Sequence, residues 1–460
     1  MNRLLFSSIT LMTGLTAGHQ LKASEQPNVL IIVLDDAGYN DFGFMGSKQI
    51  KTPHIDQLAS SGVIFTDAHV SASVSAPSRA GILSGRYQQR FGSECNLNSQ
   101  LGFSLDEETI GDVFKRNGYQ TACIGKWHQG NTPEYHPNKR GFDYFHGFIS
   151  GSRSYFYNPK GSDKPGHTQN LQINGKQISF DGYMTDILAD GAISFFRETN
   201  KPFMMYLAFN AVHTPMEATK DDLNRFKGHP RQTLAAMTWA VDRAIGKVID
   251  YLKETGKYEN TLIFFLSDNG GAYASGANNY PLKGCKGNKF EGGHRVPFFF
   301  VWADQIKGNG RYDGLTSSLD IFATAVAAAK IQPSDLKNEL DGVNLLPYLK
   351  GEKTTEPHEK LFWRKGDMAA ARIKEFKLIR VKGLEDKMYN LKENLQEEHN
   401  LIPSCPAEYK LLSENLKAWE SGLIEPRWRE SKNWETVTKE IHHDLMNNQP
   451  IRFRTPSDLK

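Results

Sequence analysis

The chain has 460 residues, a hydrophobic fraction of 39% and a formal net charge of +3 at pH 7. These values allow one large buried core with a small second unit, and they argue against a disordered or purely structural protein. The nearly balanced charge excludes a global field that would attract nucleic acid, so we expect no nucleic-acid partner and only local anion-binding clusters.

The first 24 residues have the pattern of an export signal. Arg3 supplies a positive charge, the stretch from Leu4 to Ala17 is mostly apolar, and small residues precede the polar mature chain. The apolar stretch is shorter than the roughly 20 residues of a membrane span. We therefore expect an exported protein, periplasmic or secreted, without a stable membrane anchor; a disordered cytosolic leader is the alternative.

Apolar runs that alternate with helical segments predict the main fold. The first run is NVLIIVL, and later runs cover 121–124, 202–209, 261–266 and 296–302. Helices are expected at 52–61, 109–117, 184–198 and 231–254. This alternation indicates an α/β fold with a large, mostly parallel sheet flanked by helices, whose site would lie beyond the carboxyl ends of the strands.

The pattern changes after about Pro347. Short runs (LFWRK, AAARI, FKLIRV and KMYNL) and a helical stretch at 409–423 indicate a small antiparallel sheet with a C-terminal helix. We divide the chain into a signal peptide (1–24), a catalytic domain (25–347) and a C-terminal α+β subdomain (348–460). The segment 161–177 is expected to be an exposed loop. The four cysteines lack zinc spacing and are either buried thiols or disulfides.

Two apolar runs end in oxygen-bearing side chains. Asp35 and Asp36 follow the first run, and Asp268 and Asn269 follow the run at 261–266. Such residues often only cap a turn. Two such groups at the ends of core strands favour a metal site, and carboxylate and amide oxygens favour Ca²⁺, with Mg²⁺ as the second choice.

A serine stands at the start of a predicted helix in the next segment, SVSAPSRAGILSGR. Pro77 fits a first helical turn, which leaves Ser75 just before the helix N-terminus, where free N–H groups favour an anion. The short pattern S-x-P-x-R by itself has little specificity.

Read in full, SAPSRAGILSG resembles the signature of the type I sulfatases of the alkaline phosphatase superfamily, in which Cys or Ser, x, Pro, x, Arg and four residues precede Thr-Gly. Here Ser84 replaces the threonine. Further blocks similar to that family follow in order, namely GYQTACIGKWH, RGFDYFHGF, HTP, SDNGG and KGNKFEGGHRVPF. The resemblance covers nearly the whole mature chain.

The resemblance implies the chemistry and the site. Ser75 matches the residue that a maturase oxidises to formylglycine, here one of the serine-accepting type, and its hydrate would attack sulfur and later expel sulfate. The implied calcium ligands are Asp35, Asp36, Ser75, Asp268 and Asn269. The implied catalytic partners are Arg79, which steadies the formylglycine, Lys126 and His128, which bind and deprotonate it, and His213 and Lys286, on the leaving-group side.

The substrate is less well defined. The resemblance implies a sulfated carbohydrate, and we expect exo action on 4-O or 3-O sulfate of galactose or N-acetylgalactosamine. In SGSRSYFYN, Arg153 and Tyr155 either line a sugar-binding rim or pack within a loop. Two other functions remain open: a phosphoesterase of the same superfamily with an unmodified Ser75, and a catalytically silent protein that binds sulfated glycans.

Overall fold

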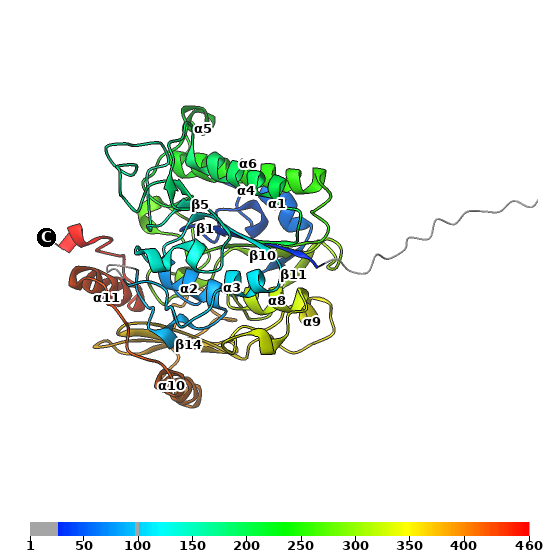
Figure 1. The fold of residues 1–460 in the computed structure, drawn as a ribbon. Helices are drawn as coiled ribbons and strands as arrows, with labels where there is room; N and C mark the ends of the chain where they lie inside the picture. Colours follow the sequence, from blue (N-terminus) through cyan, green and yellow to red (C-terminus); the bar gives the residue numbers. More distant parts are fainter. Residues whose placement is uncertain (1–25, 97–100, 460) are drawn as a thin grey trace, which may run out of the picture.

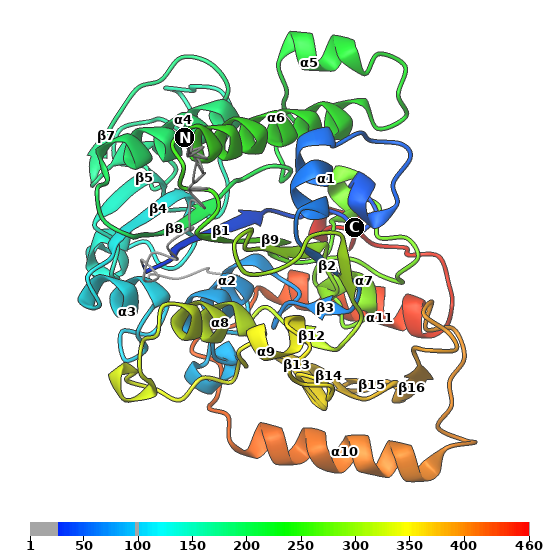
Figure 2. The ribbon, with the colours of Figure 1, turned by 90° about the vertical axis from the view of Figure 1, so that its right-hand side faces the viewer.

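The fold is taken from a computed structural model that describes residues 26–96 and 101–459 (Figures 1 and 2). The export signal predicted at 1–24 lies outside the described residues. Within the described ranges, no helix is both long and apolar enough to cross a membrane. All four cysteines are free thiols, and three of them are buried.

A ten-stranded sheet forms the middle of the molecule, in the order β11-β2-β10-β9-β1-β8-β4-β5-β6-β7. Its parallel centre consists of β9 (Thr261–Ser267), β1 (Asn28–Leu34), β8 (Phe203–Ala208), β4 (Gln120–Lys126) and β5 (Tyr144–Phe148). Every residue of β8 and β9 is buried, because helices cover both faces of the sheet. This explains why the apolar runs show no alternation with polar residues.

Short strands extend both edges of the sheet. On one side β10 (Phe298–Val301) runs antiparallel to β9, followed by β2 (Val63–Phe65) and β11 (Gly310–Tyr312). On the other side a hairpin of β6 (Gln172–Ile173) and β7 (Lys176–Gln177) pairs with β5. The prediction of an exposed loop over 161–177 is therefore wrong in part, because the hairpin belongs to the sheet and Asp163 and Asn170 are buried.

Two layers of helices cover the sheet (Figure 1). One face carries α1 (Pro53–Ser60), α4 (Met184–Glu198) and α6 (Gln232–Glu254), and the other carries α2 (Ser75–Ser84), α3 (Ile110–Arg116) and α8 (Asp320–Ala328). Leu30 and Ile32 of β1 face the first layer, and Val29 and Ile31 face the second. The predicted α/β architecture is confirmed. The shorter elements are α5 (Lys220–Arg225), α7 (Glu291–His294), α9 (Leu346–Leu349), β3 (Ala68–His69) and β12 (Thr316–Ser317).

The C-terminal part forms the predicted antiparallel sheet, with strands β13 (Lys360–Lys365), β14 (Met368–Ile373), β15 (Phe376–Val381) and β16 (Lys387–Asn390). Helix α10 (Pro406–Ser421) packs on its outer face through Leu412 and Leu416 (Figure 2). Helix α11 (Lys432–Met446) packs on the other face, together with Phe290 of the main unit. The two units therefore share a hydrophobic cluster.

We expect His146 on β5 to make stability depend on pH. Burial lowers the pKa of this histidine to about 4, and neither ring nitrogen has a hydrogen-bond partner. The folded chain thus keeps the ring neutral between pH 6.5 and 4, whereas the unfolded chain binds a proton there, so stability falls as the pH falls. The expected loss from this residue between pH 7 and pH 5 is about 2 kcal/mol.

Urea unfolding at both pH values checks this expectation. His146→Phe should remove about 2 kcal/mol of the pH dependence, and His399→Phe, at an exposed position, should leave it as in the wild type. An unchanged dependence in His146→Phe would contradict the assignment.

Candidate active site

The site forms where four parallel strands end. Asp35 and Asp36 follow β1, and Asp268 and Asn269 follow β9; all four are 4% exposed or less. Asp36 N donates to Asp268 Oδ1 at 3.2 Å, and Asn269 Nδ2 donates to Asp36 Oδ1 at 2.8 Å. The two predicted strand ends are therefore joined into one cluster of oxygen atoms, as expected for neighbouring parallel strands.

Ser75 is the first residue of α2, one position further into the helix than predicted. Its Oγ lies 3.1 Å from Asn269 Oδ1 and 3.3 Å from Asp35 Oδ1. All ten residues of α2 are buried, and Gly85 ends the helix in the left-handed conformation. A rigid, buried helix therefore presents the Ser75 hydroxyl to the carboxylates.

One turn further along α2, Arg79 binds Asp268. Its Nε and Nη2 lie 2.9 and 2.8 Å from Asp268 Oδ2, and both side chains are fully buried. Burial works against the charged form of Arg79, but Asp268, Tyr206 and Asp35 together outweigh it and raise the pKa of the guanidinium. This pair couples the helix that carries Ser75 to the end of β9.

Two lysines neutralise the aspartates. Lys126, the last residue of β4, donates to Asp35 Oδ2 at 2.7 Å, and Lys286 Nζ lies 2.8 Å from both carboxylate oxygens of Asp36. Burial alone would raise the pKa of Asp35, but Lys126, His213 and Arg79 hold it well below its usual range. The pKa of Asp36 is lowered in the same way, chiefly by Lys286.

Two histidines complete the set. His213 follows β8, and its Nδ1 donates to Thr214 O at 2.6 Å, so that its Nε2 faces Asp36 Oδ2 at 3.6 Å. Burial, followed by Lys126 and Arg79, lowers the pKa of His128 well below its usual range and keeps that ring neutral. Asp36 and His128 both have positive φ, a costly conformation that often occurs at functional sites.

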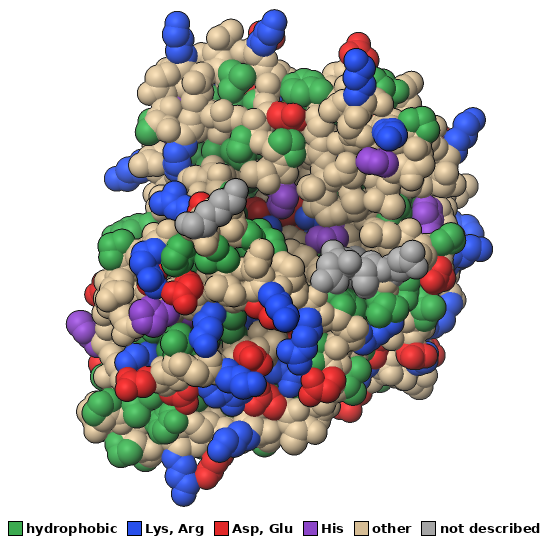
Figure 3. Space-filling model, turned by 90° about the vertical axis from the view of Figure 1, so that its left-hand side faces the viewer, with side chains coloured by type: hydrophobic (Ala, Val, Ile, Leu, Met, Phe, Trp, Pro, Cys, Tyr) green, Lys and Arg blue, Asp and Glu red, His purple; other side chains and the backbone are tan. Residues whose placement is uncertain are grey.

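The site opens toward solvent at His213 and Lys286, whose side chains are 19% and 20% exposed. Acidic, basic and histidine side chains gather in a hollow in the middle of one face of the molecule (Figure 3). Lys126, Arg79 and Asp35 are fully buried beneath this opening, and His128 is partly buried.

The oxygen cluster fits a hard divalent cation. Three carboxylates, the Asn269 carboxamide oxygen and the Ser75 hydroxyl converge without sulfur. Arg79, Lys126 and Lys286 balance the three carboxylate charges. A divalent cation together with a divalent sulfate would therefore add no net charge to the buried site.

Arg153 and Tyr155 do not lie on a sugar-binding rim. Arg153 is 1% exposed and its Nη2 binds Asp163 at 2.8 Å, while the Tyr155 hydroxyl donates to Asn210 O at 2.6 Å. Of the two interpretations, these contacts fit packing within the loop and not a sugar-binding rim. The exposed rings of the same loop are Phe156 and Tyr157.

A second buried group, His69, Glu291 and His294, has the spacing of a metal site. Cations already surround it, because Lys377 Nζ lies 2.8 Å from Glu291 Oε1 and Arg372 binds Asp67 beside His69. Its role is structural: it joins the C-terminal sheet to the chain segment that also carries Lys286. Sequence reasoning missed this cluster, since His69 and His294 are 225 positions apart in the chain.

The α/β fold, with its alkaline phosphatase-like sheet, and the residues at the strand ends define the class of this protein as a hydrolase. The family model described as "Sulfatase" matches residues 27–331. The uncharacterized sulfatase YdeN of Escherichia coli (strain K12) is 33% identical over 396 residues, covering 74% of this chain and 68% of that protein. Human N-acetylgalactosamine-6-sulfatase is 29% identical over 373 residues, 76% of this chain and 70% of that one.

A solved structure leads to the same family. The crystal structure of Ps i-CgsB, in complex with k-i-k-neocarrahexaose, superposes with a TM-score of 0.83 at 36% identity, covering 90% of this chain and 97% of that chain. The chain belongs to the sulfatase family, as its resemblance implied. It is an enzyme that hydrolyses sulfate esters, so the phosphoesterase and silent-binding alternatives are set aside.

Proposed function

We propose that this enzyme removes sulfate from a sulfated glycan of the galactan type, acting on 4-O or 3-O sulfate at a chain end. One observation supports sulfatase chemistry at these residues. The buried Ser75 Oγ lies 3.3 Å or less from oxygens of Asp35 and Asn269. The glycan class is supported by two relatives: one structure holds a neocarrahexaose, and another relative is named N-acetylgalactosamine-6-sulfatase, which supports the type of sugar and not the proposed sulfate position.

In this proposal Ser75 is oxidised to formylglycine by a serine-accepting maturase. The hydrated aldehyde supplies two hydroxyls on one carbon, one to attack sulfur and one to expel sulfate. Calcium held by Asp35, Asp36, Asp268 and Asn269 would neutralise sulfate oxygens.

The other side chains have separate tasks. Arg79 binds Asp268 and so fixes the position of the start of α2 relative to the end of β9. His128 is neutral and its Nδ1 has no hydrogen-bond partner, so we assign it as the base that receives the proton of the nucleophile. Lys126, paired with Asp35, would stabilise negative charge on the nucleophile. Lys286 and His213 stand at the opening, where they can bind sulfate and protonate the departing sugar oxygen.

The proposal also includes the predicted export and the predicted division into domains. We propose export directed by residues 1–24, followed by a catalytic domain to about residue 347 and the C-terminal subdomain beyond it. The buried ion pair of Glu291 with Lys377 gives that subdomain a supporting role, because it holds the segment next to Lys286.

A panel of sulfated sugars tests the function. Protein from its native host should release sulfate, measured by ion chromatography, from neocarrageenan oligosaccharides or from galactose and N-acetylgalactosamine sulfates. Mass spectrometry of the tryptic peptide 52–79 should show a loss of about two mass units for the two hydrogens removed from Ser75. Oxidised protein that releases no sulfate from the whole panel would overturn the glycan assignment.

A further inference from the structure

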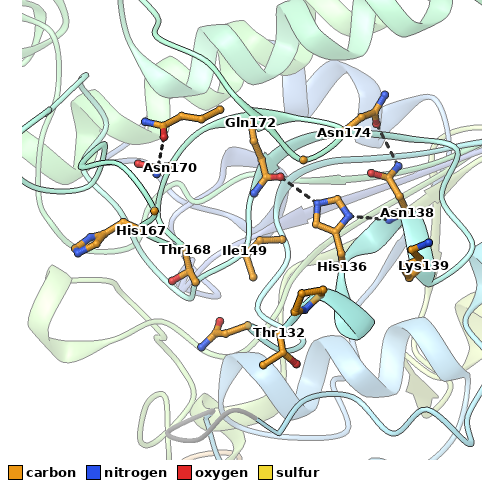
Figure 4. Close-up of a pocket in the computed structure, with 15 residues that line it drawn as sticks. Thr132, His136, Asn138, Lys139, Ile149, His167, Thr168, Asn170, Gln172 and Asn174 are labelled. Atoms are coloured by element: carbon orange, nitrogen blue, oxygen red, sulfur yellow. Dashed lines mark hydrogen bonds between the residues drawn. The ribbon is translucent and has the colours of Figure 1, made fainter.

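A polar pocket lies beside the candidate active site, between residues 131–139 and residues 166–177 (Figure 4). Its volume is about 590 Å³. The amide side chains in its wall are Asn131, Asn138, Asn170, Gln172, Asn174 and Gln177. Its described lining contains no carboxylate, and Lys139 is the only lysine or arginine in it. The chemistry of the wall is therefore mainly that of neutral donors and acceptors.

One side of the pocket holds a fixed donor. Asn138 N donates to His136 Nδ1 at 3.3 Å, so the proton of this ring sits on Nε2, which donates to Gln172 Oε1 at 3.0 Å (Figure 4). The oxygen of the Gln172 carboxamide is thereby engaged. Its NH₂ group remains as a hydrogen-bond donor at the pocket wall.

Another part of the wall holds an unpaired acceptor. Asn170 Nδ2 donates to Gln177 Oε1 at 3.0 Å, and Gln177 Nε2 donates to Asp163 O at 3.1 Å. This chain of bonds fixes the Asn170 carboxamide. Its Oδ1 has no partner and is itself closed off from solvent, so Asn170 shapes the wall but offers a ligand no acceptor in this conformation.

The pocket is joined directly to the catalytic strand ends. His128 N donates to Ile149 O at 2.9 Å, and Ile149 N donates to Thr168 O at 3.0 Å; Ile149 and Thr168 both line the pocket. Asn131 follows His128 by three residues, which limits the separation of their Cα atoms to about 11 Å. These contacts place the pocket at the same edge of the sheet as the candidate active site.

We propose that this pocket binds an uncharged sugar residue next to the sugar that carries the reacting sulfate, a proposal that rests on the proposed function. Amides both donate to and accept from sugar hydroxyls, and Ile149 and Pro133 offer apolar contact to the C–H groups of a ring. A second sulfate is a poorer match, because Lys139 is exposed and has no arginine beside it in the lining.

Chain-length dependence tests the pocket. For each protein, kcat/KM is measured on a sulfated neocarrageenan tetrasaccharide and on galactose 4-sulfate. Gln172→Ala should lower the ratio of tetrasaccharide to monosaccharide by about fivefold, the effect of one neutral hydrogen bond. Asn433→Ala, which removes an exposed amide from α11, should keep the wild-type ratio.

The outcomes separate the two proposals. A ratio unchanged in Gln172→Ala, or a wild type that does not prefer the longer substrate, overturns the sugar site and leaves the sulfatase function standing. If the oxidised wild type desulfates neither compound, the galactan assignment fails instead. In that case saturation-transfer NMR with the desulfated tetrasaccharide decides: binding weakened by Gln172→Ala supports the pocket, and absence of binding overturns it.

Discussion

Ser75→Ala is expected to abolish sulfate release, with a loss of about 10⁴-fold or more in kcat, because no other described side chain assigned to the site carries a hydroxyl. The hydroxyl removed lies among Asp35, Asn269 and the start of α2, and alanine suits a helix. We therefore expect normal folding and normal binding of the desulfated oligosaccharide. Sulfate release by ion chromatography checks the first point and a melting curve the second.

Ser78→Ala is the matched control for this prediction. Ser78 lies on the same helix, is fully buried, and its Oγ has no hydrogen-bond partner. Its removal should change sulfate release by less than about threefold, the effect of a fraction of a kcal/mol. Full activity in Ser75→Ala would remove this residue from the role of nucleophile.

Asp268→Asn is expected to lose most of the bound metal and most of the activity. The substitution keeps the size of the side chain but removes one negative charge from the oxygen cluster and from the pair with Arg79. Breaking a buried pair also leaves the arginine charge uncompensated, which costs about 3–5 kcal/mol of stability. Elemental analysis gives the metal content, and urea unfolding gives the stability.

Asp163→Asn separates the two effects. It breaks a buried pair of the same kind, with Arg153, at a position without a partner in the oxygen cluster. This variant should lose a similar amount of stability and keep its metal. Equal metal content in Asp268→Asn and the wild type would contradict the ligand assignment.

The local sequence was sufficient to predict an element wherever a single physical requirement applies to several consecutive residues. A strand buried on both faces must be apolar throughout, so β1, β8 and β9 were predictable as runs. Pro77 in a first turn placed Ser75 at a helix start to within one residue. β5 was missed, because YFHGF contains a histidine and a glycine and forms no such run.

Residue type alone could not distinguish exposure from burial. Arg153 and Tyr155 suit a sugar-binding rim by chemistry, but Asp163 and a backbone carbonyl hold them inside the loop. For the same reason the amide pocket could not be predicted from the sequence, since asparagine and glutamine occur in any surface loop. Its donor and acceptor pattern depends on which carboxamide atoms the neighbours already engage.

The amino-acid sequence by itself determined the α/β architecture, the family, and the residue types of the site, because strand burial, helix starts and short motifs are local properties. Only the tertiary structure decided which cation neutralises which carboxylate: Lys126 pairs with Asp35 across 91 positions, and Lys286 with Asp36 across 250. The physical reason is that these pairs form only when separate strand ends meet at one edge of the sheet, a long-range arrangement that no local pattern records.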